Sequence, residues 1–166
     1  SNPISSKLDS WKDQQRNNDY WYGIAIIDKT NQVNIQEVAR NQAITDIASQ
    51  IRIKINQDFK RVIEENNYQM KGHSIQTLDT QINNNLEEVE IVDFEDLGDS
   101  YMLLARLSKS KYYAAVERKR TNAKELALEY LLNVSSPSFE SFEYLSKAEN
   151  EISPYMDYPI YVIYNN

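Results

Sequence analysis

The chain has no cysteine, only 3 glycines and fewer basic than acidic residues. Each of these three features of the composition excludes a class of function. Without cysteine there is no disulfide, no thiolate nucleophile and no cysteine-ligated metal. So few glycines cannot build a glycine-rich loop that cradles phosphates. The net charge of −7 repels a phosphate backbone, so we expect no nucleic-acid partner.

Long apolar runs and histidine are also scarce. No stretch reaches the roughly 20 apolar residues of a membrane-spanning helix. His73 is the only histidine, and it stands in a polar stretch without a partner at metal-ligand spacing. A surface histidine is therefore favoured over a metal ligand or a catalytic base, and we expect neither a metal nor another cofactor.

Carboxylates are plentiful between Glu87 and Asp99, but their pattern is that of a solvated surface. Neighbouring residues on a strand point to opposite faces, whereas glycoside hydrolysis needs two carboxyl groups across one cleft. A hydrolase that uses Asp93 and Asp96 is kept as a minor alternative.

Apolar residues alternate or cluster in several strand-like runs. Residues 20–27 are aromatic and β-branched and predict a first strand. Residues 89–94 and 101–107 flank a Leu-Gly-Asp-Ser turn and predict a β-hairpin. A final strand-like run covers Pro159 to Tyr164.

The stretch from Val38 to Ile55 carries a change of apolar spacing. After a good N-cap at Asn34, spacings of three and four predict an amphipathic helix that reaches Gln50. The isoleucines at 51, 53 and 55 then follow a period of two, which predicts a half-solvated strand over residues 51–60.

Two further helices are expected in the last third of the chain. Ser108 begins a long helix that runs to about residue 133, and residues 139–152 form a second helix after the Ser-Ser-Pro-Ser break. Apolar residues such as Phe139, Phe142 and Leu145 are assigned to the stripe of that second helix. Together the two helices resemble one tetratricopeptide-type pair, which alone cannot form a solenoid.

The predicted fold class is α+β. It has an antiparallel sheet of about four strands, packed against one amphipathic helix and one long helix and followed by a helical hairpin tail. Residues 1–19 are predicted to be a flexible segment that holds at most a short helix. Residues 20–134 form the α+β domain, and residues 135–166 form a helical tail and terminal strand that could begin a further domain.

Three stretches resemble the Lpp-twenty family of small bacterial outer-membrane lipoproteins. They are the aromatic-glycine strand over residues 20–25, the Ala-Arg-x-x-Ala helix that ends in Ala-Ser-Gln-Ile over residues 39–51, and the tyrosine-to-Arg-Leu-Ser-Lys strand over residues 101–109. The resemblance covers roughly residues 20–130. It implies an α+β domain held at the outer membrane by a lipidated cysteine, which these 166 residues do not include, and it implies no enzymatic residues.

The favoured function is a non-enzymatic cell-envelope domain that acts through contacts with an unknown protein. Its only membrane contact would be the lipid anchor. The alternative is a peptide- or protein-binding adaptor with a tetratricopeptide-like tail. Exposed aromatic side chains would suit either role, and the candidate interaction surface consists of Trp21, Tyr112 and Tyr113.

Overall fold

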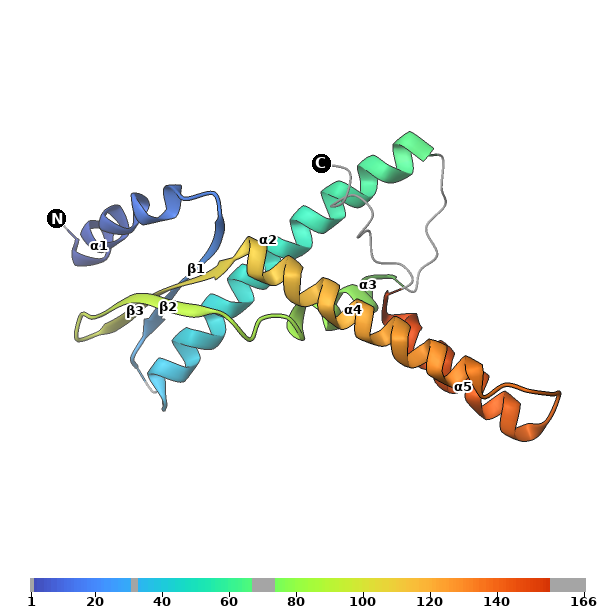
Figure 1. Cartoon of the computed structure of the whole chain (residues 1–166). Coiled ribbons are helices and arrows are strands. Elements are labelled where there is room, and N and C mark those ends of the chain that lie inside the picture. The colour runs from blue at the N-terminus through green and yellow to red at the C-terminus, as the bar shows by residue number, and fades with distance from the viewer. Residues whose placement is uncertain (1, 31–32, 67–73, 156–166) are drawn as a thin grey trace. The chain divides into compact units, whose positions relative to one another are not determined.

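The structure, a computed structural model, describes residues 2–30, 33–66 and 74–155 (Figure 1). The helices and strands are α1 (Pro3–Lys12), the 3-10 turn η1 (Gln14–Arg16), β1 (Tyr20–Asp28), α2 (Ile35–Asn66), α3 (Ser74–Asn83), β2 (Glu90–Asp96), β3 (Ser100–Ser108), α4 (Lys109–Leu132), α5 (Phe139–Ile152) and the 3-10 turn η2 (Ser153–Tyr155). The fold is α+β, as predicted.

The chain divides into two compact units. The first contains Ser1–Lys54 and Ile82–Tyr112, and the second contains Ile55–Gln81 and Tyr113–Asn166. The domain boundaries expected at residues 19 and 134 stay predictions.

The first unit is built on a three-stranded antiparallel sheet with the order β1-β3-β2. Its β2–β3 hairpin confirms the predicted pair of strands and turn. Side chains alternate between the two sheet faces, so Trp21, Gly23 and Ala25 share one face while Tyr22 and Ile24 share the other. In Figure 1, α1 and α2 lie on opposite sides of this sheet.

Helix α2 packs very closely on β1. A Cβ added to Gly23 would lie 2.0 Å from the carbonyl oxygen of Ala43, so only glycine permits this approach of helix to strand. Two α2 side chains also bind the outer edge of β1: Asp46 accepts from the amide of Ile24 at 3.1 Å, and Gln50 donates to the carbonyl of Tyr22 at 2.6 Å. These bonds occupy backbone groups that an open edge strand would leave unpaired.

The predicted strand over residues 51–60 is wrong, because α2 continues without a break to Asn66. Ile47, Ile51 and Ile55 are spaced by four and are all buried, whereas Ile53 is 56% exposed. This is the burial pattern of a helix. No glycine or proline stands between residues 35 and 66 to end it. The sheet consequently has three strands among the described residues instead of about four.

The N-terminal segment is packed, in contrast to the flexible segment predicted for residues 1–19. Asn2 caps α1 by accepting from the amide of Ile4 at 3.1 Å. Trp11 of α1 is fully buried and forms a cluster with Met102 and Leu104 of β3. The amphipathic pattern around Leu8 and Trp11 therefore produces a helix that covers one face of the sheet.

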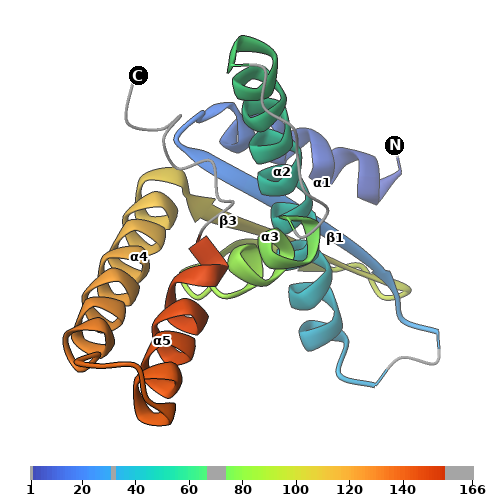
Figure 2. The ribbon, with the colours of Figure 1, turned by 90° about the vertical axis from the view of Figure 1, so that its right-hand side faces the viewer.

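In the second unit, α4 and α5 confirm the predicted helical hairpin. Figure 2 shows them side by side and antiparallel. Ser138 caps α5 by accepting from the amide of Ser141 at 3.1 Å. The terminal strand predicted for residues 159–164 lies outside the described residues.

Candidate interaction surfaces

The aromatic surface predicted from the sequence is mostly inside the protein. Trp21 is only 7% exposed and Tyr112 only 1%. Their rings meet edge to face with centroids 5.3 Å apart, so they form part of the first unit's core. This burial argues against their use as anchors for a partner. Tyr113 is half-buried, and desolvation raises the pKa of its hydroxyl; its role in binding stays a prediction.

The acidic residues of β2 are distributed by a β-bulge. The register shifts between Ile91 and Asp93, so Asp93 pairs with Leu104 and faces α1. Asp96 pairs with Tyr101 and therefore belongs to the opposite face. The two carboxylates of the hydrolase alternative thus point to different sides of the sheet.

Each of these carboxylates is held by a donor. Asp93 accepts from Trp11 Nε1 at 2.7 Å and pairs with Lys7 Nζ at 2.9 Å, and the tryptophan bond is the main cause of its lowered pKa. Asp96 pairs with Lys29, which lowers its pKa as well. A general acid needs a raised pKa, so this arrangement favours structural ion pairs over catalysis.

A cavity of about 560 Å³ lies at the start of α2 in the first unit. It is lined by Lys29, Asn34, Ile35, Gln36, Glu37, Asp96 and Tyr101. Asn34 precedes the helix as predicted, and its backbone has a φ of 58° instead of the extended conformation of an ordinary N-cap. The charged lining residues are Lys29, which pairs with Asp96, and Glu37.

Within residues 2–30, 33–66 and 74–155 no group of three or more histidine, cysteine or carboxylate side chains could hold a metal ion. His73 lies outside these ranges. None of the described helices is long and apolar enough to cross a membrane.

The second unit carries a concentration of large apolar side chains on its surface. Near the connection between α4 and α5, six of them are 42% to 86% exposed. We call this set the hairpin face: Leu128, Leu131 and Leu132 of α4, and Phe139, Phe142 and Leu145 of α5. Scattered exposed leucines are ordinary in soluble proteins, but a contiguous patch of this kind marks an interaction site.

Helix geometry places these side chains together. Ala127 of α4 and Ser141 of α5 are buried, and because the two helices lie side by side (Figure 2), we infer that these residues mark the seam between them. Leu128 and Phe142 each follow one of these residues by one position. In two antiparallel helices, residues that follow a seam residue by the same number of positions lie on the same side of the helix pair. Spacings of three and four then align the other large side chains on that side.

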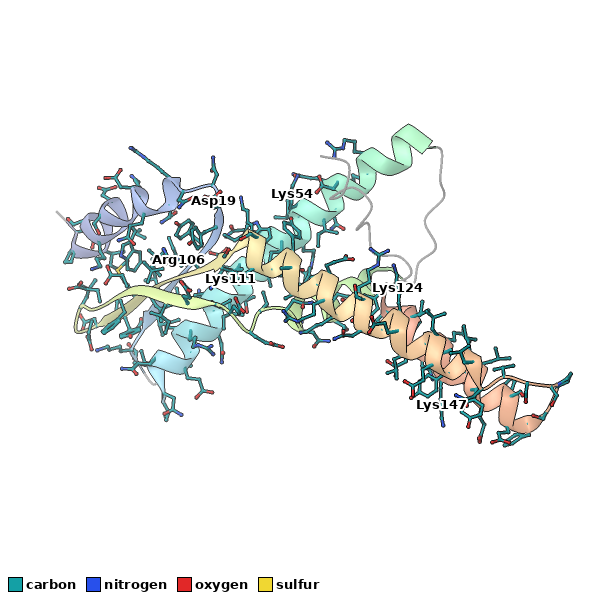
Figure 3. All side chains as sticks on the ribbon, in the orientation of Figure 1. Asp19, Lys54, Arg106, Lys111, Lys124 and Lys147 are labelled. Atoms are coloured by element: carbon teal, nitrogen blue, oxygen red, sulfur yellow. The ribbon has the colours of Figure 1, made fainter. Side chains whose placement is uncertain are left out.

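The opposite side of the hairpin is polar. Lys147 of α5 lies with its Nζ 5.9 Å from the ring centroid of Tyr130 in α4 and 5.7 Å from that of Tyr144. Figure 3 labels this lysine on α5. Glu140, which precedes seam residue Ser141 by one position, belongs to the same side and is exposed. The hairpin is therefore amphipathic, with the hairpin face as its apolar side.

Sequence reasoning missed this surface. The apolar periodicity predicts a packed stripe that contains Phe139, Phe142 and Leu145, whereas the buried residues of α5 are Ser141 and Ala148. The available signal was the spacing of small residues: seven positions separate Ser141 from Ala148, and four separate Ala123 from Ala127. These small residues are the buried ones, and their larger neighbours are exposed.

Comparison with known proteins gives one similar fold. No family model and no curated protein matches the chain. A solved structure, the crystal structure of the secreted protein HP1454 from the human pathogen Helicobacter pylori, is similar with a TM-score of 0.52 and 17% sequence identity. The match covers 90% of this chain and 61% of that one, so the chain spans about three-fifths of the length of its structural neighbour. At this identity the likeness concerns the fold.

Proposed function

We propose that this chain is a non-enzymatic domain that acts outside the cytoplasm, in the cell envelope, through protein–protein contacts made by the hairpin face. The observation that carries the proposal is the exposure of six large apolar side chains on one side of the α4–α5 hairpin. Leaving such a patch in water is unfavourable by roughly 25 cal/mol per Å², which a partner that covers it would recover.

An extracytoplasmic location is supported by two independent likenesses. The structural neighbour is a secreted protein. The sequence motifs resemble those of outer-membrane lipoproteins, which implies a lipidated cysteine in the full-length protein. Growth of the source cells with a radioactive fatty acid, followed by precipitation of the full-length protein, tests the anchor. A labelled product in the membrane fraction is expected; an unlabelled cytoplasmic product would refute the location.

The contact itself is tested by photo-crosslinking in the source cells. A benzophenone side chain replaces Leu132 in one variant and exposed Asn122, on the other side of α4, in the control. We expect one discrete protein adduct from position 132, none from position 122, and loss of the adduct when Phe142→Glu is added. Equal adducts from both positions, or none, would contradict a protein contact at the hairpin face.

An adaptor function is the second candidate. The hairpin has the form of a single helical repeat whose outer apolar surface a following helical pair would cover. In that case helices of the same polypeptide would occupy the hairpin face. Intramolecular crosslinks from position 132 in the full-length protein would favour the adaptor over the domain that binds a separate protein.

A further inference from the structure

We propose that the hairpin face docks on the hairpin face of a second copy of this chain, so that two α4–α5 hairpins form a four-helix bundle. The inference rests on the proposed function, because it names the partner of the same surface. Three observations support it: the area of the patch, the distribution of small and large residues in the hairpin, and the distribution of charge.

The exposed area is sufficient for a dimer. At about 200 Å² for a fully exposed phenylalanine and slightly less for a leucine, the six partly exposed side chains present on the order of 700 Å². Two copies would bury about twice that area, and stable interfaces bury roughly 1,200–2,000 Å² in total. The hairpin face thus accounts for most of an ordinary interface before any neighbouring residue is added.

The hairpin has small residues inside and large ones outside. Ala123, Ala127, Ser141 and Ala148 are buried, whereas the leucines and phenylalanines of the hairpin face are exposed. A helix pair that folds as a finished unit directs its large apolar residues into its own seam. The observed distribution is that of half a bundle, whose core is completed when a second pair supplies facing leucines and phenylalanines.

Charge selects this side for contact between copies. Each chain carries a net charge of −7, so two copies repel one another over most of their surface. The hairpin face consists of uncharged side chains, and an uncharged apolar face is complementary to itself in an isologous dimer. The same net charge disfavours an anionic lipid surface, which attracts basic segments instead.

Sedimentation equilibrium of the 166-residue chain tests the inference. We expect a monomer–dimer equilibrium at micromolar concentrations. The association constant should rise severalfold when salt is raised from 50 to 500 mM, because salt screens the repulsion between the two chains, with a Debye length of about 10 Å at 0.1 M salt. The double variant Leu132→Glu/Phe142→Glu should have a dissociation constant at least 100-fold higher, since two exposed apolar anchors would each be replaced by a charge. Both positions are exposed, so circular dichroism should show unchanged helix content.

A matched control separates the surface from added charge. Asn122→Glu/Asn150→Glu adds the same two negative charges to exposed positions away from the hairpin face. In 500 mM salt, which screens the added net charge, the dissociation constant of this variant's dimer should stay within about threefold of that of the parent.

Each other result overturns the inference in a distinguishable way. If the protein is a monomer at 200 μM and crosslinks to a different protein, a second copy is not the partner of the hairpin face, and the proposed function is still supported. A monomer without any crosslink refutes both. Co-sedimentation with phosphatidylglycerol vesicles that Leu132→Glu/Phe142→Glu abolishes would assign the surface to a membrane instead.

Discussion

Trp11 Nε1 donates a hydrogen bond of 2.7 Å to Asp93 Oδ2 across 82 residues of sequence. The bond joins α1 to the edge strand β2, and it exists because the bulge between Ile91 and Asp93 turns this carboxylate toward α1. Lys7, one helical turn before Trp11, lies 2.9 Å from Asp93 and 2.8 Å from Glu95. The three contacts attach the N-terminal helix to the sheet.

Asp93→Ala should lower the free energy of unfolding by about 1–3 kcal/mol, because it leaves the indole N–H of fully buried Trp11 without an acceptor. Urea unfolding followed by tryptophan fluorescence measures the change. Glu95→Ala is the control: it removes only an ion pair at the surface and should cost less than about 1 kcal/mol. Equal costs for the two variants would show that the Trp11–Asp93 bond is not the important contact.

Stability should fall below about pH 4, and Asp93 should account for part of the fall. Its pKa is lower in the folded than in the unfolded protein, because Trp11 and Lys7 favour the ionised form. Its contribution is therefore complete above the unfolded pKa of about 3.9 and is lost as the pH falls through the folded pKa.

The check is a pH series of urea titrations on the parent and on Asp93→Asn. Asp28 and Asp96 also have lowered pKa values, so the variant should still lose stability in acid. The difference between the two proteins should shrink steadily between pH 5 and pH 2. A constant difference would refute the assignment to Asp93.

Gly23→Ala should destabilise the first unit by about 3 kcal/mol, because the new Cβ would meet the backbone carbonyl of Ala43 and force α2 away from β1. Gly98→Ala meets no atom and carries only the cost of a positive φ, about 1 kcal/mol. Thermal unfolding of the two variants compares them. A Gly23→Ala protein as stable as Gly98→Ala would contradict the close packing of α2 on β1.

Ile53→Ala distinguishes a helix from a strand at the position where sequence reasoning failed. Ile53 is largely exposed in α2, and alanine is the better helix former, so the variant should be as stable as the parent or more stable by a few tenths of a kcal/mol. In a strand the same change would be destabilising by up to about 1 kcal/mol. A loss of stability in thermal unfolding would therefore contradict the continuous helix.

The sheet and the helical hairpin were predictable because their signals are local. The turn at Gly98, the aromatic run from Tyr20 and the Ser-Pro break before Phe139 each act over a few residues. The error at residues 51–60 arose because Ile51, Ile53 and Ile55 fit a period of two, while Ile47, Ile51 and Ile55 fit a period of four equally well. Only the burial of Ile47, Ile51 and Ile55 in the folded protein decides in favour of the helix.

The surfaces were less predictable because exposure depends on packing between distant segments. Trp21 is buried by contact with Tyr112, which lies 91 positions later in the sequence. No local sequence pattern predicts this contact. Leu132 and Phe142 are exposed while Ala127 and Ser141 are buried, and a stripe of apolar residues does not reveal which of its members face inward.

The most direct test of the hairpin face uses the absence of cysteine from the chain. A single cysteine at Leu128, treated with a short bis-maleimide at 50 μM protein, should give a covalent dimer in high yield. The Asn122→Cys control should stay monomeric. Adding Phe142→Glu to Leu128→Cys should abolish the dimer. A yield at position 128 no greater than that at position 122 would contradict the docking of two hairpin faces.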